Sequence, residues 1–276
     1  MSNLYTFGNK DGIELTARVY SIASDKPAIL YFHGGGLLCG EKDDLPKAYI
    51  QKFLDSGHPF ITFDYRLAPE VGLPDLYTDV QDAVNWFQAN FEQIGLTHHR
   101  FIYFGRSAGA YLTFLAAKDD SLPKPEKMIA FYGYPRLDID TFSSKTYQHI
   151  TLIPKALVDG IIGDKPVVYG PIHKRYALYL HARQTGTWIS SLFHDPTTNV
   201  NNYQLSDEDL HKLPPTFIAQ SRTDSDVPFY VSGTLHSQIP NSELFVVDQG
   251  EHDFDRDPSN PLAIEAYEKA IAFCME

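Results

Sequence analysis

The chain has 276 residues, of which 43% are hydrophobic and 13% aromatic, values typical of a folded protein with a buried core. Its net charge of −12 argues against nucleic acid as a partner and gives no support for binding to an anionic membrane, so a small neutral molecule is the expected substrate. The length suits one α/β domain with an insertion better than two separate globular units.

The first expected element is a half-exposed strand at 12–20, where apolar and polar residues alternate. Six shorter stretches further along the chain are almost continuously apolar, which is typical of strands covered by helices on both faces. They are residues 28–32, 60–63, 101–104, 128–132, 216–219 and 244–247.

Apolar side chains between these strands recur at helical spacing. One stripe runs from Val80 to Ile94 in steps of four and three, and a second runs from Ile264 to Cys274. Because strands alternate with helices, the sequence predicts an α/β fold with a mostly parallel sheet that is covered by helices on both faces.

This alternation stops near the middle of the chain. Residues 136–213 contain no clear strand, but helices are expected near 154–162 and 171–184. The segment holds eight basic and eight acidic residues, so the rest of the chain carries the whole net charge of −12, and the segment is rich in aromatic residues. We therefore expect an α/β core from residues 1–135 and 214–276 and an inserted helical cap from 136–213, with one or two of its rings lining the site.

A Gly-Arg-Ser-Ala-Gly sequence at 105–109 follows the apolar run at 101–104. Its outer glycines let a strand turn sharply into a helix, which holds the Ser107 hydroxyl clear of the sheet and turns free helix amides toward the reacting oxygen. A serine hydroxyl is a weak nucleophile at neutral pH, so it needs a base within hydrogen-bond reach and an acid that orients this base. Ser107 is the predicted nucleophile.

His252 and Asp224 are the predicted base and acid. His252 follows the last apolar run and comes two residues after a glycine, where a loop can carry its imidazole to the serine. Asp224 follows the run at 216–219, where a carboxylate can accept the other imidazole N–H and stabilise the imidazolium. Asp226 is the competing acid. We favour Asp224 because its Asp-x-x-Val-Pro sequence places the acid at the strand end and the proline at the start of the next helix, whereas Asp226 fits the N-cap of that helix.

A His-Gly-Gly-Gly sequence at 33–36 follows a buried strand. Three glycines let the backbone approach a substrate and turn its N–H groups inward, so Gly35 and Gly36, with the N–H of Ala108, form the expected oxyanion hole. A glycine-rich turn can also bind phosphate, but no Lys-Ser, Lys-Thr or Gly-x-Gly-x-x-Gly pattern accompanies this one. His33 is expected to brace the loop as a hydrogen-bond donor.

The sequences at 33–36, 64–70 and 105–109 together resemble the hormone-sensitive-lipase-like branch of the α/β-hydrolases, in which a His-Gly-Gly-Gly loop precedes the nucleophile. The similarity covers nearly the whole core, from about residue 28 to residue 254. It implies an esterase that acts on carboxylic esters, with Ser107, Asp224 and His252 as the triad and Gly35, Gly36 and Ala108 as oxyanion donors.

Three features depart from that family. Arg106 stands where the family usually has an acidic residue, and its expected state is either a pair with Asp64 or Glu70 or full solvation. The acid lies in Asp-Ser-Asp instead of Asp-Pro-Leu, and only about thirty residues precede the glycine loop, too few for the N-terminal cap of many relatives. Within the segment at 64–70, Arg66 and Glu70 are expected to form a buried ion pair that fixes the loop beneath the site.

These observations together predict a serine carboxylesterase that hydrolyses small, short-acyl esters through an acyl-enzyme and needs no metal or organic cofactor. The same residues could cleave an amide, as in an arylformamidase or a peptidase. A non-catalytic binding protein on the same fold also stays open. An exposed edge strand near Leu244 makes a homodimer a further expectation.

The expected location is cytoplasmic. The first ten residues contain no apolar segment flanked by basic residues, and no window reaches the length of a membrane span. Cys39 and Cys274 are too few for a disulfide framework and lack the spacing of metal ligands, so both are expected as free thiols, with Cys39 an ordinary buried residue near the site.

Overall fold

One eight-stranded sheet forms the centre of the molecule in a computed structural model, which describes residues 2–276. The strands are β1 (Asn3–Lys10), β2 (Ile13–Tyr20), β3 (Ala28–Phe32), β4 (Phe60–Phe63), β5 (Phe101–Arg106), β6 (Lys127–Phe131), β7 (Thr216–Ser221) and β8 (Glu243–Val247). Their order across the sheet is β1-β2-β4-β3-β5-β6-β7-β8. The pairs β1–β2 and β2–β4 are antiparallel and all other neighbours are parallel, so the sheet is mostly parallel, as predicted.

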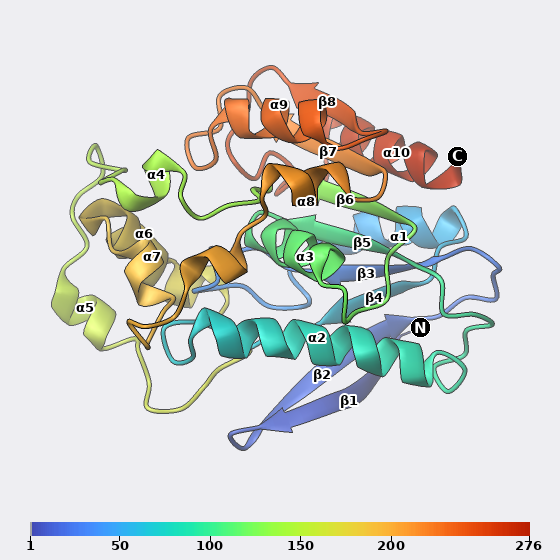
Figure 1. Cartoon of the computed structure of the whole chain (residues 1–276), viewed down its shortest axis with the longest axis horizontal. Coiled ribbons are helices and arrows are strands. Elements are labelled where there is room, and N and C mark those ends of the chain that lie inside the picture. The colour runs from blue at the N-terminus through green and yellow to red at the C-terminus, as the bar shows by residue number, and fades with distance from the viewer. Residues whose placement is uncertain (1) are drawn as a thin grey trace.

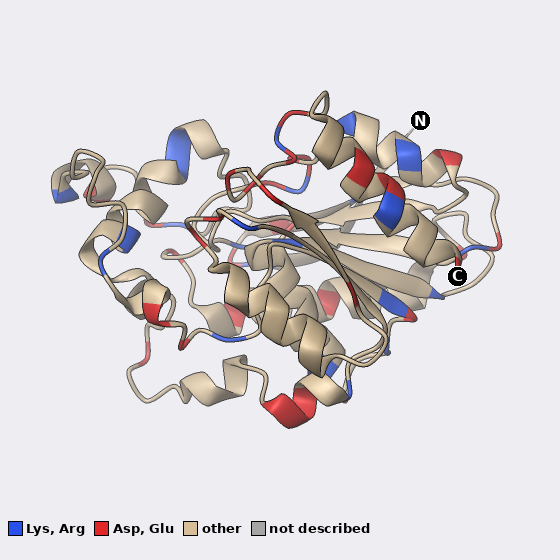
Figure 2. Ribbon diagram, turned by 90° about the horizontal axis from the view of Figure 1, so that it is seen from above, with Lys and Arg blue, Asp and Glu red and all other residues tan. Residues whose placement is uncertain are grey.

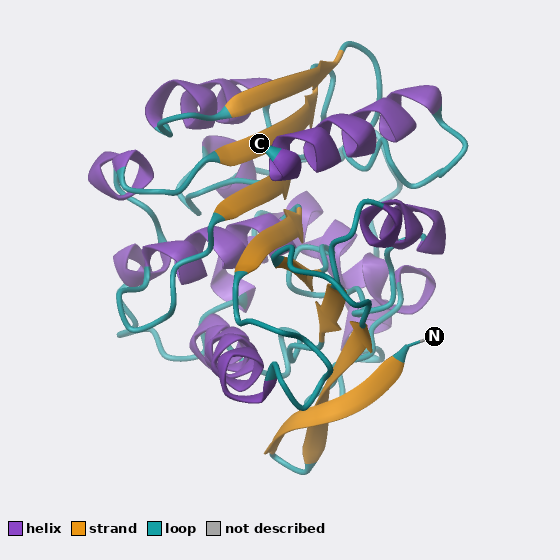
Figure 3. Cartoon of the chain, turned by 90° about the vertical axis from the view of Figure 1, so that its right-hand side faces the viewer, coloured by secondary structure: helices purple, strands orange, loops and turns teal. Residues whose placement is uncertain are grey.

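Helices cover both faces of this sheet (Figures 1 and 3). One face is covered by α1 (Lys47–Asp55) and α10 (Pro261–Met275), which contact each other. The other face is covered by α2 (Leu73–Asn90), α3 (Ala108–Lys118), α8 (Asp207–His211) and α9 (Phe229–Gln238). The predicted α/β architecture is therefore confirmed.

The continuous apolar runs follow from this layering. In β3, Leu30 packs into the core beneath α2 and α3, whereas Ile29 and Tyr31 pack into the core beneath α1 and α10. Every residue of β3 is buried, and the same is true of β5 and β7. A strand with two buried faces has no position for a solvated side chain, which removes the polar–apolar alternation.

The N-terminal hairpin explains why only its second strand was predicted. The expected strand at 12–20 is β2, whereas β1 has a largely exposed pattern and an irregular register between Thr6 and Gly8 that breaks its alternation. Asp11 and Gly12 join the two strands with positive φ values of 54° and 79°, as a tight two-residue turn requires.

Helix α2 is shorter than its apolar stripe. It begins after Gly72 and ends at Asn90, so Phe91 and Ile94 of the predicted stripe pack onto the core from the turn that follows. The apolar stripe continues because this turn packs against the same surface as the helix. The spacing of apolar residues alone cannot distinguish such a turn from a longer helix.

The expected ion pair between Arg66 and Glu70 is wrong. Arg66 donates from Nε and Nη2 to the two carboxylate oxygens of Asp79 in α2, each at 2.8 Å. The Glu70 carboxylate accepts hydrogen bonds from Arg175 at 2.8 and 2.6 Å. The chain turns between the two residues, so their side chains diverge and each pairs with a different helix.

The segment between β6 and β7 contains short helices and no strand of the sheet. Its elements are α4 (Asp140–Ser143), α5 (Lys155–Asp159), α6 (Ile172–Thr185), α7 (Trp188–Ser191), the 3-10 helix η1 (Val200–Tyr203) and α8. In Figure 1, α4, α5, α6 and α7 gather at one end of the sheet, whereas α8 packs against α9 over one of its faces. The helix expected at 154–162 is thus confined to α5, while that at 171–184 is α6.

Charged residues of both signs are dispersed over the helices and loops around the sheet (Figure 2). Within residues 2–276, no helix combines the length and the apolar character needed to span a bilayer.

Candidate active site

Ser107 occupies the sharp turn between β5 and α3. Its φ and ψ are 52° and −120°, a backbone conformation that L-residues adopt only where the surroundings enforce it. A Cβ on Gly105 would lie 2.3 Å from the amide nitrogen of Ala110, and one on Gly109 would lie 2.0 Å from the carbonyl oxygen of Phe32. Both glycines are therefore required by close backbone approach, as the pentapeptide predicts.

The structure brings Ser107, His252 and Asp224 together in a line of hydrogen bonds. His252 Nδ1 lies 2.7 Å from Asp224 Oδ2, and His252 Nε2 lies 2.8 Å from Ser107 Oγ. Because a carboxylate only accepts, Nδ1 carries the proton of the neutral imidazole, and in that form Nε2 is left to accept the proton of the Ser107 hydroxyl. These three residues come from three separate loops at the carboxyl ends of β5, β7 and β8.

The acid loop fixes Asp224 in this orientation. Asp224 Oδ1 accepts from the backbone N–H groups of Asp226 at 2.7 Å and Val227 at 2.9 Å, and Oδ2 also accepts from Gln220 Nε2 at 2.7 Å. Asp226, the competing acid of the sequence analysis, makes no hydrogen bond to His252 within the described chain. It pairs with Arg183 of α6 at 2.8 Å instead.

The electrostatics of the pair favour an imidazolium held by a carboxylate. Burial alone lowers the pKa of His252, but the charge and hydrogen bond of Asp224 outweigh it, and Asp226 and Asp253 add to the rise, which brings the pKa of His252 to about 9. Burial raises the pKa of Asp224, but the charge and hydrogen bond of His252 and the two backbone N–H groups lower it further, so the pKa of Asp224 lies below its ordinary value.

The glycine loop lies directly beside the serine. A Cβ on Gly34 would lie 2.9 Å from the Arg106 carbonyl oxygen and 3.3 Å from Ser107 Cβ. Gly35 and Gly36 have φ values of 102° and 60°, and a Cβ on Gly35 would overlap the backbone of Cys39. Only glycine fits this path.

The predicted oxyanion donors lie at this loop and at the start of α3. Within residues 2–276, no hydrogen-bond acceptor meets the N–H of Gly35, Gly36 or Ala108, and Gly35 and Gly36 line the pocket that also contains Ser107. His33 braces the loop, since its Nδ1 lies 2.8 Å from the Gly34 carbonyl oxygen and its ring stacks on that of Tyr65 at 4.1 Å.

The insertion between β6 and β7 also holds the glycine loop. Trp188 Nε1 donates a hydrogen bond of 2.8 Å to the Gly36 carbonyl oxygen, and a Cβ on Gly36 would lie 2.4 Å from the ring of Tyr179. Tyr179 in turn donates to Asp226 on the acid loop at 2.7 Å. The two loops that flank the serine are therefore tied to the same helical segment.

Arg106 has a different partner from those expected. Its guanidinium is buried and lies 3.2 Å from the carboxylate of Asp255, which also accepts from Tyr132 at 2.6 Å and Tyr267 at 2.7 Å. Asp64 pairs with a lysine instead. Asp255 follows His252 by three residues, so this cluster joins the strand that carries the serine to the loop that carries the histidine.

This cluster could not be predicted from the sequence. Its one sequence signal is Arg106 itself, a charged residue between an apolar strand and a helix that the fold must bury, but Asp255 and the two tyrosines lie far along the chain and carry no motif. Burial lowers the pKa of Arg106, but Asp255 and the neighbouring tyrosines and Asp44 outweigh it, so the pKa stays well above its ordinary value.

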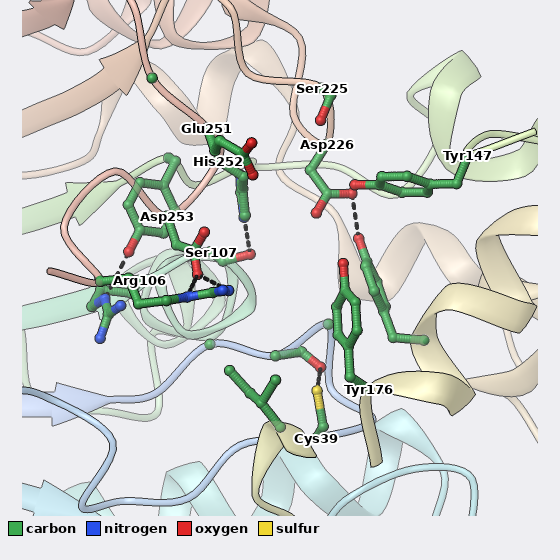
Figure 4. Close-up of a pocket in the computed structure, with 18 of the residues that line it drawn as sticks. Cys39, Arg106, Ser107, Tyr147, Tyr176, Ser225, Asp226, Glu251, His252 and Asp253 are labelled. Atoms are coloured by element: carbon green, nitrogen blue, oxygen red, sulfur yellow. Dashed lines mark hydrogen bonds and ion pairs between the residues drawn. The ribbon is translucent and has the colours of Figure 1, made fainter. Parts of the chain in front are cut away.

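A cavity of about 790 Å³ opens above the serine and histidine (Figure 4). The insertion contributes Tyr147, Ile150, Tyr176 and Tyr179, and Cys39, which is buried, lines the opposite part. Through the part of the chain that the structure describes, no group of three or more histidine, cysteine or acidic side chains is arranged to hold a metal ion.

The chain is similar to several known proteins. A family model described as an alpha/beta hydrolase fold matches residues 29–229. The crystal structure of a protein of unknown function from Staphylococcus aureus subsp. aureus Mu50 is similar with a TM-score of 0.87 and 32% identity, over 99% of this chain and 98% of that one. An alpha/beta hydrolase superfamily protein from Enterococcus faecalis is similar with a TM-score of 0.86 and 27% identity, over the same shares of both chains.

The similarity to two curated proteins covers less than half of the length of each. An ethyl acetate hydrolase from Pseudomonas putida is 33% identical over 132 residues, which cover 45% of this chain and 42% of that protein. The non-reducing polyketide synthase mapC' from Penicillium brevicompactum is 24% identical over 94% of this chain, but this chain spans only 15% of its length.

Proposed function

Because this chain belongs to the α/β hydrolase family, whose model matches residues 29–229, we propose that it is a serine carboxylesterase that hydrolyses small carboxylic esters through an acyl-enzyme. The observation that carries the proposal is the continuous contact of Ser107 Oγ, His252 and Asp224, at 2.8 and 2.7 Å. The similarity to an ethyl acetate hydrolase supports an ester as the substrate.

In the first half-reaction, Ser107 Oγ attacks the ester carbonyl carbon while His252 Nε2 takes the hydroxyl proton. The new C–O bond converts the carbonyl into an oxyanion, which the N–H groups of Gly35, Gly36 and Ala108 would bind. Removing one such donor typically costs about 2.7–4 kcal/mol of transition-state stabilisation. When the oxyanion collapses, the bond to the leaving alkoxide breaks and His252 gives it the proton.

In the second half-reaction, water takes the place of the alcohol. His252 removes a proton from this water, the resulting hydroxide attacks the acyl carbon, and collapse releases the carboxylic acid and returns the proton to Ser107. Asp224 holds the Nδ1 proton and stabilises the imidazolium in both halves. No step needs a metal ion or an organic cofactor.

The segment at 136–213 acts in this proposal as a cap that shapes the pocket. Tyr147, Tyr176 and Tyr179 line the cavity from this side, and in this proposal their rings narrow it around a short acyl group. The tie from Tyr179 and Trp188 to the glycine loop supports a cap that also stabilises the oxyanion donors.

Steady-state hydrolysis of p-nitrophenyl acetate tests the proposal. We expect turnover by the wild-type protein and a loss of at least about a thousandfold in Ser107→Ala and His252→Ala, with circular dichroism to check that both variants fold. N-formylkynurenine and a prolyl anilide are assayed in parallel. Faster turnover of either amide, relative to its uncatalysed rate, would replace the esterase by an amide hydrolase, and no turnover of any of the three would reject the proposal.

A further inference from the structure

The wall of the pocket holds a second buried carboxylate that the proposed ester chemistry does not use. Asp226 is 6% exposed and lines the cavity on the side of the acid loop. Asp224 is the carboxylate that meets His252. A buried carboxylate is unfavourable unless hydrogen-bond donors or cations surround it, so each oxygen of Asp226 is expected to have such a partner.

Only one of these oxygens is satisfied inside the protein. Asp226 Oδ1 accepts hydrogen bonds from the Tyr179 hydroxyl at 2.7 Å and from Arg183 Nη1 at 2.8 Å. Arg183 is fully buried and also donates to the Asp226 carbonyl oxygen at 3.4 Å, which fixes the position of the carboxylate. Between residues 2 and 276 no hydrogen bond reaches Asp226 Oδ2, and the further donor on this carboxylate, the Tyr147 hydroxyl, lies beside one of its oxygens in Figure 4.

The second oxygen is turned into the cavity. In Figure 4 one oxygen of Asp226 lies beside the Tyr147 hydroxyl, and the other points into the space between His252 and Tyr176. A substrate bound at Ser107 would fill this space. The second oxygen therefore faces the cavity in which a substrate at Ser107 would bind.

Several other side chains that line this cavity are polar. Thr223 and Ser225 line the same side of the cavity, with Tyr176 across from them and Glu251 on the histidine loop. An alkyl chain placed here would cover Asp226 Oδ2 and exclude water without supplying a donor, which disfavours plain alkyl esters. A hydroxyl or ammonium group in the same place would complete the coordination of the carboxylate.

The charges around Asp226 also favour a hydroxyl or ammonium group at this position. Asp226 and Asp253 both contribute to the raised pKa of His252, so the field at this point of the pocket stabilises positive charge. Arg183 neutralises part of the Asp226 charge from behind. A neutral hydroxyl and an ammonium group are both compatible with such an acceptor, whereas an anionic substituent is not.

We propose that Asp226 is a specificity-determining residue whose free oxygen accepts a hydrogen bond from a hydroxyl or ammonium group of the substrate. The site then takes small esters that carry such a donor in preference to alkyl esters of the same size. This inference rests on the proposed esterase function and names the substrate class of the same pocket.

Isosteric esters test the inference with the protein as it is. On the acyl side, p-nitrophenyl butyrate is compared with the p-nitrophenyl esters of 3-hydroxypropionate and 3-aminopropionate. On the alcohol side, propyl acetate is compared with 2-hydroxyethyl acetate and 2-aminoethyl acetate. Each kcat/KM is divided by the hydroxide-catalysed rate of the same ester, which removes differences in intrinsic reactivity.

We expect the donor-bearing ester of at least one series to be preferred by about 10- to 100-fold, the effect of one hydrogen bond to a charged acceptor. The hydroxyl and ammonium arms identify which donor the site prefers. Equal normalised values in both series, with clear turnover of the alkyl esters, would overturn the inference and leave the esterase proposal intact. No turnover of any ester would overturn both.

Asp226→Asn gives a second, independent readout. Oδ1 accepts from Tyr179 and Arg183, so the asparagine must keep its carbonyl oxygen there and turn its NH₂ group into the pocket. A donor then replaces the acceptor, and we expect the preference for hydroxyl or ammonium esters to disappear. Tyr176→Phe is the matched control, because it removes another pocket hydroxyl and keeps the acceptor. Should Asp226→Asn fail to fold, the wild-type ratios alone decide.

Discussion

Replacement of Asp224 by asparagine tests the proposed proton path, because the surrounding hydrogen bonds determine which way the new amide must face. Asp224 Oδ1 accepts from the backbone N–H groups of Asp226 and Val227, at 2.7 and 2.9 Å. An NH₂ group in that position would face two donors. The asparagine must therefore keep its carbonyl oxygen there and direct its NH₂ group toward His252.

This orientation reverses the tautomer of the imidazole. The NH₂ group donates to His252 Nδ1, so the ring proton moves to Nε2, which lies 2.8 Å from Ser107 Oγ. Nε2 then donates to the hydroxyl and cannot accept its proton. We expect kcat for p-nitrophenyl acetate to fall by about 10⁴, the loss typical of a triad with the wrong tautomer, or about 5.4 kcal/mol of barrier.

The fold should tolerate this change. Gln220 Oε1 is buried and has no hydrogen-bond partner in residues 2–276, so reversal of the Gln220 amide offers an acceptor to the new NH₂ group, at the cost of the 3.1 Å hydrogen bond from Gln220 Nε2 to the Val227 carbonyl oxygen. Thermal unfolding should therefore show a folded protein with low activity. Asp248→Asn is the matched control, because this carboxylate also follows β8 but is 84% exposed.

Steady-state kinetics at several pH values provide the assay. A loss of less than about tenfold in Asp224→Asn, with the control unchanged, would refute the reasoning, since His252 would then reach its working tautomer without Asp224. A large loss in the Asp248→Asn control would show that the assay reports loop damage and not the proton path.

Three other predictions follow from the same geometry. The pKa of His252 is raised to about 9, and only the neutral imidazole is a base. The value of kcat/KM should therefore rise by about tenfold per pH unit from pH 7 and level off near pH 9. A flat profile over this range would contradict the raised pKa. Gly36→Ala places a Cβ 2.4 Å from the Tyr179 ring at a φ of 60°, which displaces the N–H of residue 36. We expect kcat to fall by about 10²–10³ with a smaller change in KM. An unaltered kcat would exclude Gly36 as an oxyanion donor. Asp255→Asn removes the carboxylate beside the buried Arg106, so urea denaturation should show a loss of about 3–5 kcal/mol of unfolding free energy, and a loss under about 1 kcal/mol would mean that the pair contributes little.

The central sheet could be predicted from the sequence because its strands are buried on both faces. Such strands leave continuous apolar runs, and β3, β4 and β5 begin where those runs begin. The positions of Ser107, Asp224 and His252 could be predicted for a related reason. Parallel strands end at the same edge of the sheet, so residues that follow three of them are brought close together by the topology alone.

The partners of buried charges could not be predicted. Arg66 and Glu70 are close in sequence and opposite in charge, but a turn separates them. Arg66 meets Asp79 in α2, 13 positions away, and Glu70 meets Arg175 in α6, 105 positions away. Arg106 likewise meets Asp255, which is 149 positions away. Which carboxylate reaches a buried arginine depends on the packing of several elements, and no local pattern records that packing.

The most direct test of the account is the covalent labelling of Ser107. A fluorophosphonate reacts with a serine only when a neighbouring base activates its hydroxyl, so intact-mass measurement should show one adduct per wild-type chain, mapped by peptide analysis to Ser107 and absent from Ser107→Ala. Folded wild-type protein that stays unlabelled, or an adduct that persists in Ser107→Ala, would contradict the claim that Ser107 is the activated nucleophile.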